Sequence, residues 1–222
     1  MNAILFDASA VVSWYFDESS RAKESLSRIL RLKEELGCIL YLPNICIPEV
    51  LNAFARRRQE HNKSGHRLSR TEYTANLDRF KRDIHWGKLF YPYDLNRYHM
   101  IAADEIIPFE YEVKRQAKGD KDKQYDRLSG FDILVIAMAS ELAFVHGPER
   151  SFLVTGDSRM KRVCDAIKAT PPKERAHSRG PRFFTDIPAG RWPAPRCFDI
   201  RNDDPIHIPP VISGRPADGL RA

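Results

Sequence analysis

Short apolar runs alternate with longer amphipathic stretches along the first 170 residues of the chain. Four runs bounded by polar or turn-forming residues predict strands, at residues 3–6, 39–42, 89–91 and 151–155. The stretches between them carry apolar residues at helical spacing. Because strands that alternate with helices tend to pair in parallel, the pattern predicts an α/β fold, a three-layer sandwich with a mainly parallel central sheet flanked by helices.

The helices are expected between these strands, and several of their ends carry recognisable signals. A first helix is expected over residues 9–16 with Ser9 as its cap, and a second over 18–36 that ends at Gly37. Further helices are expected from residue 49 onward, on both sides of a turn at Gly65, over 96–118 with an interruption at Pro108, over 133–139 and over 159–168. The helix over 133–139 is apolar on all sides, so it is expected to be buried.

The composition changes near residue 170. Ten of the fifteen prolines and eight arginines stand from Thr170 onward. We therefore divide the chain into a domain over residues 1–169, with a basic helical insertion around 56–88, and a Pro/Arg-rich C-terminal extension over residues 170–222. One further strand is expected inside this extension, at residues 197–200.

Positive charge is concentrated in the insertion. The chain has 36 Lys and Arg against 30 Asp and Glu, a net charge of +6. Residues 56–88 hold ten basic against four acidic side chains, so the excess in this segment alone equals the net charge of the chain. Such a segment favours polyanionic partners. The apolar runs fall short of the ~18 residues that span a bilayer, and the four cysteines lack C-x-x-C spacing. We expect a protein without a membrane role in a reducing cytoplasm.

Four acidic residues stand where one predicted element gives way to the next: Asp7, Glu49, Asp132 and Asp157. Each also has a structural explanation as a turn residue or helix cap, and Ser129 with Asp132 has the spacing of a capping box. In a parallel α/β sheet, however, the ends of the strands and the starts of the following helices lie at one edge. Carboxylates gathered there repel one another unless a cation neutralises them, and oxygen donors favour Mg²⁺ or Mn²⁺ over zinc.

The segments around these acids resemble, in order, the four acidic motifs of PIN-domain ribonucleases, the family that includes VapC-like toxins. The matching segments read ILFDAS at 4–9, PEVLN at 48–52, LSGFDILVIA at 128–137 and FLVTGD at 152–157. The resemblance implies a PIN-like fold over the strand-and-helix framework, from residue 1 to about residue 167. The segments after residue 170 have no counterpart in it.

The resemblance also implies a function. It implies that the chain is a metal-dependent endoribonuclease and the toxin of a toxin-antitoxin pair. RNA would then be its substrate, an antitoxin protein a possible partner, and a homodimer its assembly. The catalytic and metal-binding acids that it implies are Asp7, Glu49, Asp132 and Asp157, with Ser9 and Thr155 as supporting hydroxyls. One or two Mg²⁺ or Mn²⁺ ions would activate a water for in-line attack on a phosphodiester, leaving a 5′-phosphate and a 3′-hydroxyl.

Three consecutive arginines, Arg56, Arg57 and Arg58, follow the predicted helix of Glu49 and are expected to attract RNA phosphates. They could equally form a solvated helix face. Two other functions remain open from the residues alone. One is an RNA-binding module whose acids only cap helices. The other is a phosphatase with a nucleophilic aspartate, which would need a second aspartate where Ser9 stands.

Overall fold

The computed structural model describes residues 2–16, 20–59, 68–85, 87–117, 127–170 and 192–204, and the structural statements below refer to these. Within them the chain forms a five-stranded sheet with the order β3-β2-β1-β4-β5, in which every pairing is parallel. The strands are β1 (Ala3–Phe6), β2 (Ile39–Pro43), β3 (Tyr91–Tyr93), β4 (Ser151–Thr155) and β5 (Arg196–Asp199). β1 is therefore the central strand, and all four of its residues are buried.

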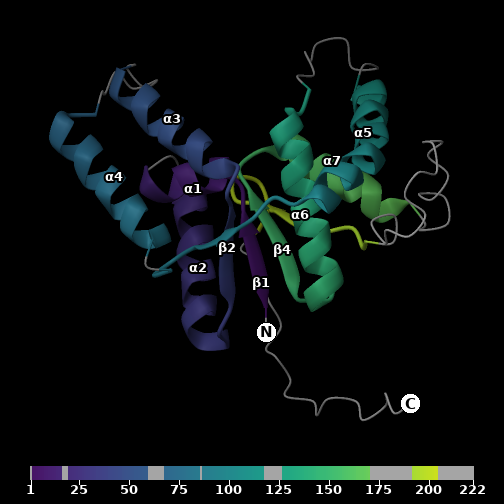
Figure 1. The fold of residues 1–222 in the computed structure, drawn as a ribbon, viewed down its shortest axis with the longest axis horizontal. Helices are drawn as coiled ribbons and strands as arrows, with labels where there is room; N and C mark the ends of the chain where they lie inside the picture. The colour runs from purple at the N-terminus through teal and green to yellow at the C-terminus, as the bar shows by residue number, and fades with distance from the viewer. Residues whose placement is uncertain are drawn as a thin grey trace.

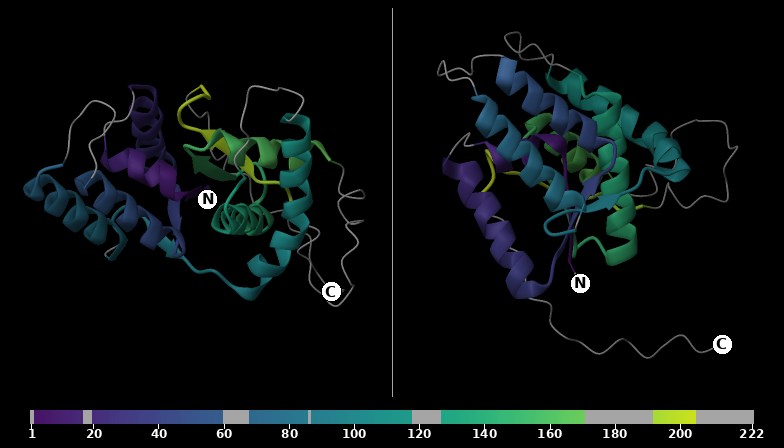
Figure 2. Two further views of the ribbon diagram at one scale, coloured as in Figure 1. Left: turned by 90° about the horizontal axis from the view of Figure 1, so that it is seen from above. Right: turned by 60° about the vertical axis from the view of Figure 1, so that its left-hand side comes forward.

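The helices form a layer on each face of this sheet. They are α1 (Ala8–Tyr15), α2 (Ser20–Leu36), α3 (Cys46–Gln59), α4 (Arg70–His85), α5 (Arg97–Ala117), α6 (Gly130–His146) and α7 (Ser158–Ala169). Helices α1 to α4 lie on one side of the strands and α5 to α7 on the other (Figures 1 and 2). The predicted three-layer α/β sandwich with a parallel central sheet is confirmed.

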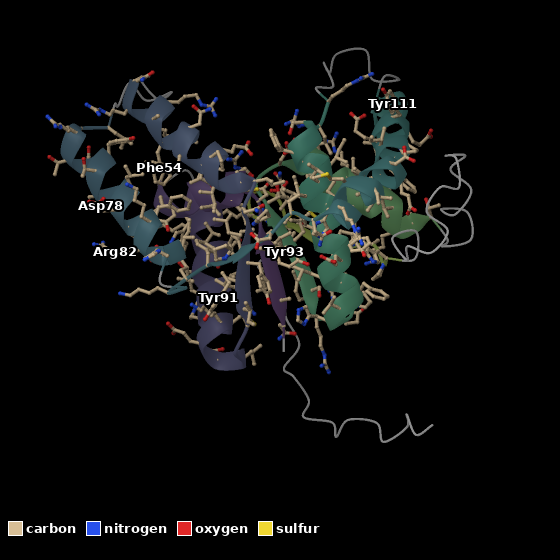
Figure 3. The ribbon with its side chains drawn as sticks, in the orientation of Figure 1. Phe54, Asp78, Arg82, Tyr91, Tyr93 and Tyr111 are labelled. Carbon is tan, nitrogen blue, oxygen red and sulfur yellow. The ribbon has the colours of Figure 1, made fainter. Side chains whose placement is uncertain are left out.

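The two helical layers are packed by different kinds of side chain. On the side of α1 to α4, the rings of Tyr15, Phe54 and Phe80 contact one another with centroids 5.4 to 5.6 Å apart. Figure 3 shows Phe54 inside this layer, with Asp78 and Arg82 on the outer side of α4. On the other side, α6 packs on β1 and β4 with small and aliphatic residues, and it is buried from Val135 to Ala143 except Glu141. Helices thus pack on both faces of the sheet, and the ends of its strands have defined positions.

Two sequence-based expectations about helices are wrong. The cap of α1 is Asp7 and not Ser9: the Asp7 carboxylate accepts the backbone N–H of Ala10, so the shorter Ser9 side chain is left for other partners. The interruption expected at Pro108 is absent, because α5 runs through it. Pro108 is exposed, so the carbonyl that it leaves without a helical N–H can face water.

The fifth strand comes from the predicted C-terminal extension. β5 pairs with β4 from Phe152–Arg196 to Thr155–Asp199, and Phe198 and Ile200 are buried in the core. Residues 192–204 thus belong to the same sheet as the N-terminal strand. The turn at Gly65 and most of the extension lie outside the described residues. In the part of the chain that is described, no helix is long and apolar enough to cross a membrane.

Candidate functional site

Asp7 lies at the carboxyl end of the central strand and is 4% exposed. Its Oδ1 accepts the backbone N–H of Ala10 at 2.8 Å and the hydroxyl of Ser9 at 2.7 Å. Its Oδ2 accepts the hydroxyl of Thr155, at the end of β4, at 2.5 Å. The neighbouring strand and the following helix therefore fix the orientation of this carboxylate from both sides.

The two hydroxyl groups also bind the loop that follows β4. The backbone N–H of Gly156 donates to Ser9 Oγ at 2.7 Å, and that of Asp157 donates to Thr155 Oγ1 at 2.8 Å. Each hydroxyl thus accepts one hydrogen bond from the loop and donates one to Asp7. The predicted supporting residues lie where the sequence placed them, and their contacts are with the carboxylate and the backbone.

Burial makes Asp7 a weaker acid than an exposed aspartate. Desolvation raises its pKa from 3.8 to about 6, and the negative charge of Asp132 raises it further, against the hydrogen bonds from Thr155, Ala10 and Ser9 that lower it. The donors around Asp7 are all neutral. A buried carboxylate with neutral donors and an acidic neighbour is a position at which a cation would be strongly favoured.

Two further acids lie within electrostatic reach of this position. Glu49 stands in the first turn of α3, and Asp132 in the first turn of α6. Partial burial raises the pKa of Glu49, and the charge of Asp132 raises it further. The Cys46 thiol, also in α3, has its pKa raised mainly by burial and then by Asp7, Glu49 and Asp132 together. The charge of Asp132 thus acts on both Asp7 and Glu49, and we call Asp7, Glu49 and Asp132 the acidic site.

Asp157, the fourth predicted acid, has a different environment. It caps α7, and its Oδ1 accepts the backbone N–H of Arg159 at 2.8 Å. The Arg159 guanidinium donates to both of its oxygens, with Nε at 3.0 Å from each and Nη2 at 2.5 Å from Oδ2. Burial acts to raise the pKa of Asp157, but Arg159 and the more distant charge of Arg201 outweigh it and hold this pKa below 3.8.

The carboxylate oxygens of the acidic site are ligands of the kind that bind a hard divalent cation, but they do not form a complete coordination site. Among the described residues, no three His, Cys, Asp or Glu side chains form a group that could hold a metal ion as they stand. Two of the predicted acids already have other partners: the Asp132 carboxylate accepts the backbone N–H of Ser129 in the predicted capping box, and Asp157 is paired with Arg159. The all-oxygen donor set of Asp7, Glu49 and Asp132 fits Mg²⁺ or Mn²⁺.

The three predicted RNA-binding arginines lie in the last turn of α3 and have different contacts. The positive charge of Arg56 acts on Glu49, against the effects that raise its pKa. The Arg57 guanidinium lies 5.1 Å from the centroid of the Phe16 ring, and that of Arg58 lies 5.3 Å from the Tyr73 ring. A role in RNA binding therefore stays a prediction for all three.

Sequence reasoning missed two arginines beside the acidic site, Arg159 and Arg201. A signal for Arg159 was present, because it stands two positions after Asp157, as Ser9 stands two after Asp7. Arg201 follows β5, and only the pairing of this strand with β4 brings it near Gly156.

A second polar cluster, also missed, joins the layer of α5 to α7 to the sheet. His99 is fully buried; its Nδ1 accepts the backbone N–H of Asn96 at 3.0 Å and its Nε2 lies 2.6 Å from Glu141. The Tyr93 hydroxyl donates to the same Glu141 oxygen, and Figure 3 places Tyr93 over the sheet. Burial lowers the pKa of His99, against the charge of Glu141. Neutral His99 then donates from Nε2, which fits a structural link.

Comparison with known proteins gives little beyond this geometry. No family model and no curated protein matches the chain. Among solved structures, it is similar to a chain of VapBC2 from Rickettsia felis bound to a DNA fragment from their promoter. The sequences are 12% identical, the match covers 72% of this chain and 92% of the other, and the TM-score is 0.40. A likeness of this size leaves function to be argued from the residues themselves.

Proposed function

We propose that the chain is a metal-dependent endoribonuclease of the PIN type, the toxin of a toxin-antitoxin pair. The observation that supports this most strongly is the acidic site. Asp132, at the start of α6, acts electrostatically both on Asp7, at the end of β1, and on Glu49, at the start of α3, and burial raises the pKa of Asp7 to about 6. A fold retains such mutual repulsion most readily where a cation relieves it.

Asp7, Glu49 and Asp132 would hold Mg²⁺ or Mn²⁺, which when bound supplies a water of lowered pKa and neutralises charge on the scissile phosphate. The residues of the chain supply orientation. Ser9 and Thr155 donate to opposite oxygens of Asp7 and so fix the plane of its carboxylate. The backbone N–H of Ser129 donates to Asp132 and would help to orient this carboxylate.

The substrate in this proposal is RNA, and the basic segment around residues 56–88 would attract its phosphates. Helices α3 and α4 together carry seven Lys or Arg against four Asp or Glu, half of the net charge of +6, and the three arginines of α3 stand in the same helix as Glu49. Such cationic side chains gather a polyanion without reading its sequence, so they account for affinity and not for the choice of cleavage site. The antitoxin partner and the homodimer belong to the same proposal.

The decisive experiment incubates the full chain with end-labelled RNA in Mn²⁺, in Mg²⁺ and in excess EDTA, beside Asp7→Asn and Asp78→Asn variants. Both variants remove one negative charge, but Asp78 lies on the exposed face of α4, away from the site (Figure 3). We expect metal-dependent cleavage in the native chain and in Asp78→Asn, and a loss of about a thousandfold or more in Asp7→Asn.

Cleavage that persists in EDTA, or that Asp7→Asn leaves intact, would overturn the proposal. RNA binding without cleavage in any metal would favour the RNA-binding module in its place. Circular dichroism of both variants checks that each is folded.

A further inference from the structure

Two arginines from distant parts of the chain meet beside the acidic site. Arg159 belongs to the first turn of α7 and binds both oxygens of Asp157. Arg201 follows β5, and its guanidinium lies over Gly156: a Cβ on this glycine would lie 3.4 Å from both Cζ and Nε of Arg201 and 3.1 Å from Ser9 Oγ. The arginine therefore lies next to the hydroxyl that orients Asp7.

The backbone that carries Arg201 is fixed, although the residue itself is exposed. The buried Asp199 carboxylate accepts the backbone N–H of Arg201 at 2.9 Å and the side-chain amide of Asn202 at 2.6 Å. The Asp203 carboxylate in turn accepts the backbone N–H of Asp199 at 2.9 Å. The turn after β5 thus presents a guanidinium at the carboxyl edge of the sheet from a constrained position.

We propose that Arg201 binds the phosphate backbone of RNA at the acidic site, and that Asp157, neutralised by Arg159, does not serve as a fourth metal ligand. This inference rests on the proposed nuclease function. A carboxylate already bound by a guanidinium through both oxygens has little charge left for a divalent ion. The Arg201 guanidinium, which lies beside this ion pair at Gly156, would repel that ion and attract phosphate oxygens.

The arrangement then has two halves with distinct tasks. The acidic site would hold the cation, and Arg201 lies beside it across Ser9 and Gly156. A phosphate between them would have its negative charge met from both sides, as hydrolysis of a phosphodiester requires.

The first test measures RNA binding in an Asp7→Asn background, in which cleavage is prevented. Affinity of a fluorescent single-stranded RNA is followed by anisotropy in Mn²⁺ at several salt concentrations, with Arg201→Gln compared with Arg196→Gln. Both arginines belong to the β5 region, but Arg196 lies at the opposite end of the strand and pairs with Glu149. Loss of one phosphate contact should lower the salt slope by about 0.7 in Arg201→Gln, with no change in Arg196→Gln.

The second test measures Mn²⁺ binding by calorimetry without RNA. We expect Glu49→Gln to weaken binding by about tenfold or more, since it removes a ligand charge. Asp157→Asn should change it by less than about twofold, because Arg159 already neutralises that carboxylate. In cleavage assays, Asp157→Asn and Arg201→Gln should raise KM more than they lower kcat.

The outcomes separate this inference from the proposed function. If Arg201→Gln has the salt slope of Arg196→Gln, or if Asp157→Asn loses Mn²⁺ as fully as Glu49→Gln, the inference is wrong while metal-dependent cleavage by the native chain still supports a nuclease. If the native chain neither cleaves nor binds RNA, the proposed function fails and the inference fails with it. Arg201→Lys, which keeps the charge, should recover most of the salt slope.

Discussion

The ends of β1 and β4 are neighbours in the sheet, and each is followed by an aspartate that caps a helix, yet the two carboxylates are in opposite electrostatic states. Asp7 has neutral donors and a pKa raised to about 6 by burial, whereas Asp157 is bound by Arg159 and its pKa is lowered despite burial. Two causes make the difference: Asp7 is more deeply buried, and the residue two positions later is a neutral donor, Ser9, beside Asp7 but a charged one, Arg159, beside Asp157. Fold topology thus delivers a carboxylate to the edge, and the local sequence determines its charge balance.

The largest effect is expected at Thr155, which serves both aspartates. Its hydroxyl donates to Asp7 and accepts the backbone N–H of Asp157, and the residue is fully buried. Thr155→Val keeps the shape but removes the hydrogen bond to the buried Oδ2 of Asp7 and the one from the backbone N–H of Asp157, so the free energy of unfolding should fall by about 4 kcal/mol. Urea denaturation at pH 7 measures this. Thr155→Ser keeps the hydroxyl and should lose much less; equal losses would contradict the explanation.

The next effect is the pH dependence of stability in EDTA. Because the pKa of Asp7 is about 6 when folded and 3.8 when unfolded, the folded state holds an extra proton between these values. Stability contributed by Asp7 should therefore fall as the pH rises from 4 to 6, by about 3 kcal/mol in all. Asp7→Asn should abolish this fall and Asp157→Asn should retain it. Parallel pH profiles for the native chain and Asp7→Asn would show that Asp7 titrates normally.

The affinity for metal should depend on pH through the same carboxylate, because a bound ion requires Asp7 to be deprotonated. With a pKa of about 6 for Asp7, Mn²⁺ binding at pH 5 should be about tenfold weaker than at pH 7, equivalent to about 1.4 kcal/mol. Calorimetry at the two pH values measures the ratio. The ratio should be the same in Asp157→Asn, because the Asp157 carboxylate of the native chain has a lowered pKa and stays ionised at both pH values. A ratio near one would remove Asp7 from the metal site.

The smallest effect is expected for Arg159→Gln. Since Arg159 holds the pKa of Asp157 below 3.8, the pair stabilises the fold above that pH, and its contribution is lost as the pH falls through the lowered value. The pair is partly exposed, so we expect a loss of about 1 kcal/mol at pH 7 and little difference near pH 2. Arg196→Gln provides the matched control. A loss that is equal at both pH values would point to packing and not to charge.

The fold was predictable where local pattern and burial agree. β4 spans the predicted residues, because an apolar run between polar neighbours fits a fully buried strand. β3 is shifted to Tyr91–Tyr93, because the backbone N–H groups of Leu89 and Phe90 both donate to the Asp83 carbonyl and leave the pairing with β2 to the next residues. Pro92 is tolerated there because β3 is an edge strand.

The sequence predicted which acids and hydroxyls belong to the candidate site, but not which side chains would bind one another there. Motif order placed four acids and two hydroxyls near one edge, and the structure brings Asp7, Ser9 and Thr155 into direct hydrogen bonds. The capping role of Asp132 was also readable from its spacing to Ser129. The position of Arg201 depends on the pairing of β5 with a strand far back in the sequence, which no local pattern encodes.

The central position of β1 has a consequence for synthesis of the chain. β1 is the strand that needs partners on both sides, but it ends at Phe6 and its partner β4 begins only at Ser151. Until β4 has been made, Asp7 has no Thr155 hydroxyl as a partner. A growing chain therefore cannot complete its acidic edge before that strand emerges, so any activity that depends on this edge has to wait for the long-range pairing of β1 with β4.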